Sequence, residues 1–197
     1  MGRIIAGSER GRRLKGPPSH LTRPMSDKVR EALFAVLGSM GAGPLRVLDL
    51  YAGTGAIGIE ALSRGAEHAD FVDSQKAACS VIRDNLAIAQ FTHQGAVHCM
   101  PIDLIYQRLR GPYDLVILDP PYAAPDIATQ LEHLAASSLL QSDALVALGH
   151  WPRLHLPDAI GRLTLLRTRC HGDSCFSIFA VETSPGTDET TNEARDS

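Results

Sequence analysis

The sequence has no apolar run near the roughly 18 residues that a membrane-spanning helix needs, and it starts without the apolar core of a signal peptide. Aromatic residues make up only 5% of the 197 residues, and Trp occurs once. We therefore expect a cytoplasmic protein that makes no contact with membranes. The hydrophobic content of 44% is still sufficient for one domain with a sizeable core.

Cysteine is also scarce, with four residues in the whole chain. All four lie within or beside apolar segments, and we expect them to be reduced, small core residues: Cys79, Cys99, Cys170 and Cys175. The group Cys170, His171 and Cys175 lacks the spacing of a zinc knuckle, and no second cysteine pair accompanies it. We therefore expect no bound metal.

Positive charge is concentrated at one end of the chain. Residues 1–30 hold eight basic and two acidic side chains, a net charge of +6, whereas the whole chain has a net charge of −3. A basic segment on an acidic body is a candidate contact for a polyanion such as RNA. A solvated hairpin that is merely basic would look the same. The candidate RNA-binding residues are Arg3, Arg10, Arg12, Arg13, Lys15 and Arg23.

The order of expected elements indicates an α/β fold. Residues 3–6 and 11–15 flank a polar turn and predict a β-hairpin, and a helix follows the N-cap signal at Ser26. Short strands then alternate with helices, which indicates a doubly wound parallel sheet. We expect strands at 46–50, 70–73, 96–99, 115–118 and 144–148, and helices at 56–63, 75–89, 104–109 and 127–137.

The C-terminal part departs from this alternation. Residues 163–168 and 176–182 predict an antiparallel pair joined through Gly172 and Asp173, which gives a seven-stranded, mostly parallel sheet. The polar segment 184–197 cannot bury a core, and we expect it to be disordered. We therefore divide the chain into a basic arm (1–24), one domain (25–183) and a tail (184–197).

A glycine-rich loop lies within "VLDLYAGTGAIGIEAL", residues 47–62. Gly53, Gly55 and Gly58 follow a strand and open a helix, so that the backbone can approach a ligand closely. Asp49 lies inside the strand, four residues before the first glycine. A dinucleotide phosphate has no need of an acid there. The acid suits a ligand with an ammonium group, such as the amino-acid end of S-adenosylmethionine.

Further acids lie at or near the ends of the neighbouring strands. Asp73, Asp103 and Asp119 should reach the same crevice as Asp49, because the carboxyl ends of parallel strands share one edge of the sheet. Asp73 would accept the ribose hydroxyls, and Asp103 the exocyclic amine of adenine. The alternative is that Asp73 and Asp103 simply cap the helices that follow them.

The stretch "ILDPPYAAP", residues 117–125, predicts a rigid shelf after a strand. Proline fixes φ and removes an N–H donor, so that the Pro120 carbonyl is held as a free acceptor. Asp119 adds a second acceptor and Tyr122 a flat face. Two acceptors and a stacking surface suit a planar ring that carries an exocyclic amine. The alternative is a plain turn with a solvent-facing tyrosine.

These motifs together resemble a known family. The shelf "DPPY", the loop "DLYAGTGAIGIEALSRGA", the arm "RIIAGSERGRRLKGP", and the segments "TRPMSDKVREALF" and "HGDSCFSIF" are similar to those of bacterial 16S rRNA guanine-N2 methyltransferases, over about residues 2–182. This family is also called conserved hypothetical methyltransferases. The resemblance implies a Rossmann-like class I methyltransferase that uses S-adenosylmethionine.

The resemblance also implies roles for particular residues. Asp119, Pro120 and Tyr122 would hold the flipped guanine, Arg23 would lie near the cleft, and the arm would bind 16S rRNA, either free or in an assembled small subunit. The cofactor site would be lined by Asp49, Tyr51, Gly53, Gly55, Asp73, Asp103 and Asp119. The chain departs from the family at Gly149 and His150, where a glutamate is usual, and at His171, where tyrosine is frequent.

Three other functions remain open on the sequence. A DNA amino methyltransferase shares the shelf but usually needs a large recognition domain, for which this chain has no room. A protein glutamine methyltransferase normally has asparagine in place of Asp119. A non-catalytic RNA-binding relative could keep the fold alone, although the intact loop and shelf argue against such decay.

Overall fold

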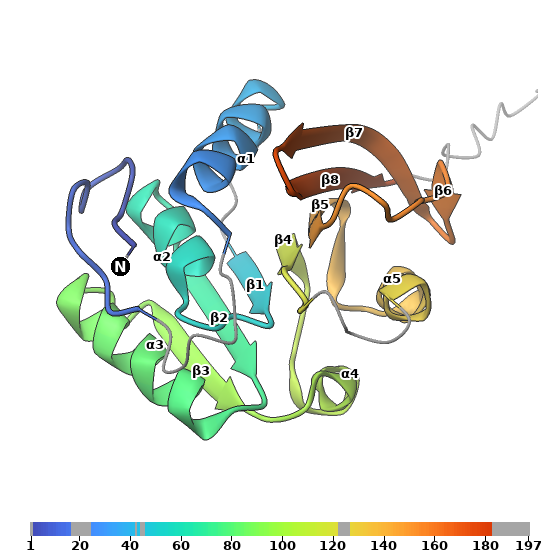
Figure 1. Ribbon diagram of the computed structural model, residues 1–197. Helices are drawn as coiled ribbons and strands as arrows, with labels where there is room; N and C mark the ends of the chain where they lie inside the picture. The colour runs from blue at the N-terminus through green and yellow to red at the C-terminus, as the bar shows by residue number, and fades with distance from the viewer. Residues whose placement is uncertain (1, 17–24, 42, 44–45, 122–126, 183–197) are drawn as a thin grey trace, which may run out of the picture.

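The structure is a computed structural model that describes residues 2–16, 25–41, 43, 46–121 and 127–182. Its centre is an eight-stranded sheet in the order β3-β2-β1-β4-β5-β8-β7-β6, with helices on both faces (Figure 1). The strands are β1 Arg46–Leu50, β2 His68–Asp73, β3 Gly95–Cys99, β4 Tyr113–Leu118, β5 Leu140–His150, β6 Ala159–Ile160, β7 Leu163–His171 and β8 Ser174–Val181. The helices are α1 Asp27–Ser39, α2 Ala56–Ser63, α3 Lys76–Ile88, the short 3-10 helix η1 Ile102–Leu104, α4 Ile105–Arg108 and α5 Ile127–Ala136.

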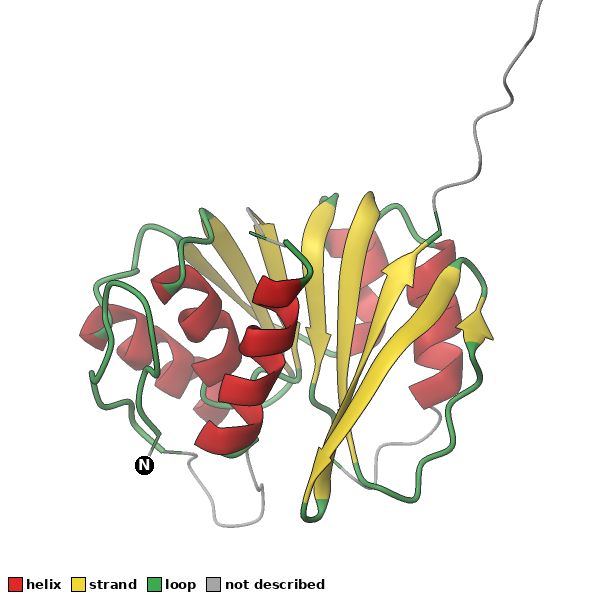
Figure 2. Cartoon of the chain, turned by 90° about the horizontal axis from the view of Figure 1, so that it is seen from above, coloured by secondary structure: helices red, strands yellow, loops and turns green. Residues whose placement is uncertain are grey.

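The sheet confirms the expected α/β architecture. Strands β1 to β5 pair in parallel, and β8, β7 and β6 continue the sheet in antiparallel fashion (Figure 2). The strand order reverses between β1 and β4, which places a ligand crevice outside the carboxyl ends of these two strands. The structure adds β6 to the seven expected strands, because two residues are too few to leave a pattern in the sequence.

Two hydrophobic layers hold the sheet between its helices. Helices α1, α2 and α3 pack on one face, and α4 and α5 pack on the other. The central strands β1 and β4 are buried on both faces, which explains their nearly continuous apolar runs. Gly58 allows α2 to approach the sheet, since a Cβ at this position would lie 2.4 Å from the ring of Phe71.

The described part of the N-terminal arm, residues 2–16, is folded onto the domain. Its ends pair through a single antiparallel bridge, Arg3 to Arg13, rather than through two full strands. Ile4 and Leu14 are buried in the core beneath α1 and α2. The described part of the arm therefore belongs to the surface of the domain. Its division from the domain as a separate unit stays a prediction.

One buried carboxylate fastens the arm. Glu60 on α2 is fully buried and accepts the backbone N–H groups of Ile5 and Ala6 at 2.7 and 3.0 Å. Arg64 Nε donates to it at 2.8 Å, and Arg30 Nε lies 3.8 Å away. Arg30, also buried, donates to the carbonyl of Arg3 at 2.6 Å. Glu60 thus joins the arm, α1 and α2.

The expectation that all four cysteines are reduced was wrong for one pair. Cys170 and Cys175 form a disulfide between β7 and β8. The two-residue turn at Gly172 and Asp173 sets a register that places these cysteines directly opposite each other, with 4.0 Å between their Cα atoms. Cys79 is buried and free as expected, whereas free Cys99 is exposed. Among the described residues, no helix is long and apolar enough to span a membrane.

The tail beyond residue 182 lies outside the described residues, as do two site residues expected from the sequence, Arg23 and Tyr122.

Glu60→Ala tests the anchoring of the arm. The substitution takes away the carboxylate beside buried Arg30 Nε, although Asp27 still pairs with Arg30 Nη2, and removes the acceptor of two backbone N–H groups and of Arg64 Nε. We expect the free energy of unfolding, measured by urea denaturation, to fall by about 3–5 kcal/mol, as when a buried ion pair is broken. The matched control is Glu67→Ala, an exposed carboxylate just after the same helix, which should change stability by less than about 0.5 kcal/mol. Equal losses in the two variants would contradict the anchoring role.

Candidate active site

The glycine-rich loop makes a left-handed turn between β1 and α2. Tyr51, Gly53 and Gly55 have φ angles of 58°, 56° and 73°, and Gly55 is the N-cap of α2. Glycine adopts this region freely, but Tyr51 does so at a cost of about 1–3 kcal/mol. The Tyr51 hydroxyl donates to Gln130 Oε1 on α5 at 2.6 Å. This bond holds the loop next to the helix that follows the shelf.

Asp49 lies beneath this turn with one half of its carboxyl unsatisfied. Oδ2 accepts the N–H of Gly58 at 2.9 Å, whereas buried Oδ1 has no hydrogen-bond partner among the described residues. Burial raises the pKa of Asp49 to about 8, and the nearby charges of Asp119 and Asp73 contribute to the rise. A buried acceptor without a donor is costly. The site therefore fits a cationic donor such as an ammonium group.

Asp73 supports the loop and the next helix at once. Its Oδ2 accepts the N–H of Gly53 at 2.9 Å, and its Oδ1 accepts the N–H of Gln75, the N-cap residue of α3, at 2.8 Å. The bond to Gln75 forms a turn just before α3, whose own N-cap has no side-chain hydrogen bond, so that helix capping by Asp73 is not seen. Each carboxylate oxygen retains a further lone pair. Its side chain is nearly buried at the crevice and remains compatible with a ligand hydroxyl.

Asp103 lies on η1, beyond the end of β3. Its negative charge helps to raise the pKa values of Tyr51 and Tyr106, after the larger effect of burial. Asp103 is therefore a neighbour of the glycine loop and not part of the cluster formed by Asp49, Asp73 and Asp119. All four expected acids lie at the same edge of the sheet. Asp49, Asp73 and Asp119 are close to one another there, and Asp103 lies farther along the edge.

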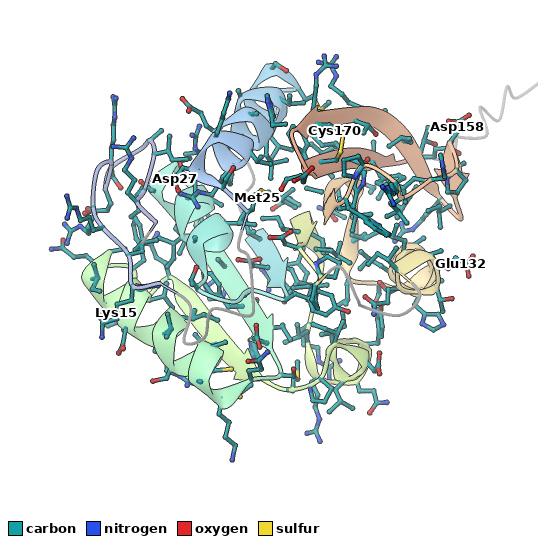
Figure 3. The ribbon with its side chains drawn as sticks, viewed as in Figure 1. Lys15, Met25, Asp27, Glu132, Asp158 and Cys170 are labelled. Atoms are coloured by element: carbon teal, nitrogen blue, oxygen red, sulfur yellow. A yellow bond between two sulfur atoms is a disulfide. The ribbon has the colours of Figure 1, made fainter. Side chains whose placement is uncertain are left out.

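The shelf begins where β4 ends. The backbone N–H of Asp119 donates to the carbonyl of Leu50 at 3.4 Å, which places the shelf beside the end of β1. Burial raises the pKa of the Asp119 carboxyl to about 6, although the backbone N–H of Met25 donates to it and lowers the pKa. Met25 lies between α1 and the central strands (Figure 3). Pro120 is half-buried beside Asp119.

Gly149, at the end of β5, is a site residue whose role the sequence did not reveal. A Cβ at this position would lie 2.2 Å from Asp119 Oδ1 and 3.3 Å from the Met25 side chain. Glycine therefore makes the space that the Asp119 carboxylate occupies. His150 instead bonds Ser177 and the carbonyl of Trp151, both at 2.9 Å, and burial lowers its pKa. Its two ring nitrogens are therefore engaged within the fold, and it does not take the place of an acid at the end of β5.

Several arm residues expected to bind RNA already serve the fold. Arg12 pairs with Glu9 and donates to the carbonyl of Ile88 at 2.5 Å, and Lys15 pairs with Asp84 at 2.8 Å. Arg3 lies 3.8 Å from Asp27, a loose and exposed pair. Arg10 and Arg13 are exposed, with no side-chain partner among the described residues.

The described crevice thus holds an unpaired carboxyl oxygen of Asp49 on one side and the carboxyl of Asp119 on the other. Class I methyltransferases place such a site at the switch point of a doubly wound sheet, and the chain has their fold. Among the described residues, no group of three or more His, Cys, Asp or Glu side chains could hold a metal ion.

Comparison with known proteins gives the family. The model of the family "Conserved hypothetical protein 95" matches residues 2–180, and the chain belongs to this family. It is 34% identical to the putative rRNA methyltransferase YlbH of Bacillus subtilis, over 90% of this chain and 97% of the relative. It is 30% identical to ribosomal RNA small subunit methyltransferase D of Escherichia coli K12, over 91% and 90% of the two chains.

Solved structures agree with this assignment. A putative methyltransferase from Escherichia coli, yhhF, superposes with a TM-score of 0.80 at 28% identity, over 92% of this chain and 98% of that one. The hypothetical protein TTHA0928 of Thermus thermophilus gives a TM-score of 0.78 at 29% identity, over 90% and 98%. The protein is thus a methyltransferase with the Rossmann-like fold that its sequence resembles.

Gly149→Ala tests whether this glycine makes room for Asp119. The added methyl group would force the carboxylate to shift by about 1 Å, and a misplacement of that size costs roughly 100-fold in rate. We expect the turnover of methyl transfer to fall by this factor while cofactor affinity, measured by calorimetry, stays within a few-fold. Gly38→Ala in α1, where a Cβ would meet no atom within 4 Å, is the control. Unchanged turnover in Gly149→Ala would contradict this role.

Proposed function

We propose that the protein transfers a methyl group from S-adenosylmethionine to the exocyclic N2 amine of a guanine in 16S rRNA. The observation that carries the proposal is the unsatisfied carboxylate of Asp49 in the same crevice as the Asp119-Pro120 shelf. The names of two relatives, a putative rRNA methyltransferase and a small subunit rRNA methyltransferase, support ribosomal RNA as the substrate.

The residues around the glycine loop fit the proposed cofactor. Asp49 Oδ1 would accept a hydrogen bond from the ammonium group of the cofactor. The backbone of the turn at Gly53 and Gly55 would contact the cofactor directly. Asp73 would accept ribose hydroxyls, with Asp103 and Tyr51 on the adenine side. S-adenosylmethionine would supply the electrophilic methyl group, and the protein would supply orientation and the exclusion of water.

The shelf would act on the amine rather than on the methyl group. Asp119 and the carbonyl of Pro120 would accept the two N–H groups of the guanine amine, with Tyr122 stacked on the base. This would direct the nitrogen lone pair at the methyl donor, so that most of the rate gain comes from proximity. With a pKa of about 6, Asp119 is largely ionised at pH 7 and accepts hydrogen bonds. It need not be a strong base, since the nitrogen can lose its proton after transfer.

The target base must leave its stack to reach the shelf, and RNA loops offer such bases at low cost. The arm residues Arg3, Arg10, Arg12, Arg13 and Lys15, together with Arg23, would hold phosphates and make binding sensitive to salt. Arg10 and Arg13 have the most available charge. The substrate would be either free 16S rRNA or the rRNA within an assembled small subunit. A cytoplasmic location is part of the same proposal.

Cofactor binding should release a proton from Asp49. At pH 7 a carboxyl with a pKa of about 8 is mostly protonated in the free protein, whereas the ammonium ligand requires its ionised form. We expect the release of about one proton per cofactor at pH 7. Calorimetry in two buffers of different ionisation enthalpy measures it, and Asp49→Asn should abolish the buffer dependence. Binding by the wild type without proton exchange would overturn the assignment of Asp49.

Asp119→Ala tests the shelf. We expect turnover on rRNA from a strain that lacks the gene to fall by at least about 100-fold, with cofactor affinity within a few-fold of the wild type. Asp143→Ala on β5, an exposed carboxylate, should behave as the wild type. Mass mapping of nucleosides from the deletion strain identifies the product, and an unchanged N2-methylguanosine profile would refute the proposed function.

A further inference from the structure

A second region of the surface carries concentrated positive charge. Residues 151–172 contain four arginines and one acid, a net charge of +3, in a chain whose total is −3. The fold uses Arg162, which donates to the carbonyls of Ala135 and Ser137 at 2.6 and 2.8 Å. Arg167 and Arg169 on β7 are exposed, and their side chains have no ion pair or hydrogen bond among the described residues. Their charge is therefore available to a ligand.

The register of the sheet places Arg169 level with the shelf. Leu118, just before Asp119, pairs with Leu148, so that Asp119 stands beside Gly149. Gly149 pairs with Phe176 on β8, and Phe176 pairs with Arg169 on β7. Three steps between strands, at about 4.8 Å each, give roughly 14 Å from the Asp119 backbone to that of Arg169. This distance corresponds to a few nucleotides of extended RNA.

Both arginines also lie on the face of the sheet that holds the Asp119 carboxylate. Arg169 is opposite Phe176 and Arg167 is opposite Ile178, and directly paired residues point to the same face. Phe176 and Ile178 belong to the core layer beneath α1. The Asp119 carboxylate is on this face too, because it touches the space where a Gly149 Cβ would be. Thr168 points to the other face, where it bonds Ser177 at 2.7 Å.

β7 is open to solvent along its outer side. Its pairing with β6 covers only Leu163 and Thr164, and the hairpin extends past the central strands at the crevice edge (Figure 2). Trp151, which follows β5 at this edge, is 43% exposed and offers a surface on which a base can stack. The arm lies at the other side of the molecule, as the positions of Lys15 and Cys170 show (Figure 3).

We propose that Arg167 and Arg169 form a second RNA-binding surface, which holds the phosphates of the nucleotides next to the target base. Residues two apart on a strand are about 6.8 Å apart, a spacing that lets two guanidinium groups bind successive phosphates. The inference rests on the proposed function, because it assumes an RNA substrate. It gives the crevice a basic wall on the side opposite the arm.

Two alternative roles for these arginines predict different results. Charged side chains on an edge strand can simply prevent aggregation, in which case their removal would lower solubility and leave RNA affinity intact. Alternatively, β7 could pair with β7 of a second copy. Such a pair would bring the arginines of both copies together, so charge favours RNA over a dimer.

The test compares Arg167→Gln/Arg169→Gln with the wild type in binding to 16S rRNA from a strain that lacks the gene. The loss of two phosphate contacts should raise Kd by roughly 10- to 30-fold at 0.1 M salt and reduce the slope of log K against log salt by roughly 1.4. The affinity for S-adenosylmethionine should not change. The conservative variant Arg167→Lys/Arg169→Lys should keep most of the RNA affinity.

A matched control removes the same charge from the opposite side of the sheet. Arg108 and Arg110 are exposed and lie before the start of β4, and Arg108→Gln/Arg110→Gln should leave RNA affinity within about twofold. Equal losses in the two double variants, an unchanged Kd in the first, or a loss of cofactor affinity would overturn the inference. A wild-type dimer that dissociates in the Arg167→Gln/Arg169→Gln variant would also overturn the inference.

If the wild type neither binds nor methylates the rRNA, the proposed function itself fails. If it methylates and the variant binds equally well, only this inference fails.

Discussion

The carboxylate of Glu60 is the interaction on which the organisation of the site depends. It lies in the interior of α2, the helix that the glycine loop opens, and it accepts three N–H donors while the Arg30 guanidinium lies beside it. A buried carboxylate without such partners would cost several kcal/mol. Glu60 thereby fixes the arm and the start of α1 to the loop. Since Met25, just before α1, donates to Asp119, the same junction extends to the shelf.

The buried acidic side chains of the crevice lower the stability of the free protein. Asp49, Asp73 and Asp119 lie close enough for the latter two to raise the pKa of Asp49. Burial of an acid with one unpaired oxygen destabilises the free protein, and a cationic ligand would remove that penalty on binding. Asp73 is the exception, because two backbone N–H groups already satisfy it. Its role in the loop explains why an acid at this position is needed even before any ligand binds.

The sequence predicted well the structural features that are set by residues close together in the chain. Alternating apolar segments indicated the doubly wound sheet, and the glycines with Asp49 indicated the loop. Features that depend on distant residues could not be predicted. The contact of Glu60 with Ile5 and the space that Gly149 leaves for Asp119 follow from tertiary register. The disulfide is a local feature, because Cys170 and Cys175 lie five residues apart across the predicted turn, and the expectation of reduced cysteines missed it. The two-residue strand β6 was too short to leave a periodic signal.

The distribution of charge gives a physical reason why an amine would be the target. Acidic side chains line the crevice, and the ionised carboxylate of Asp119 would repel a phosphate there. Part of the available positive charge lies to either side of the crevice, at Arg10 and Arg13 on the arm and at Arg167 and Arg169 on β7. In the proposed function, an RNA backbone would be attracted to both flanks rather than to the centre. A neutral base could enter between these flanks, and the two N–H groups of an exocyclic amine would donate hydrogen bonds to Asp119 and to the carbonyl of Pro120.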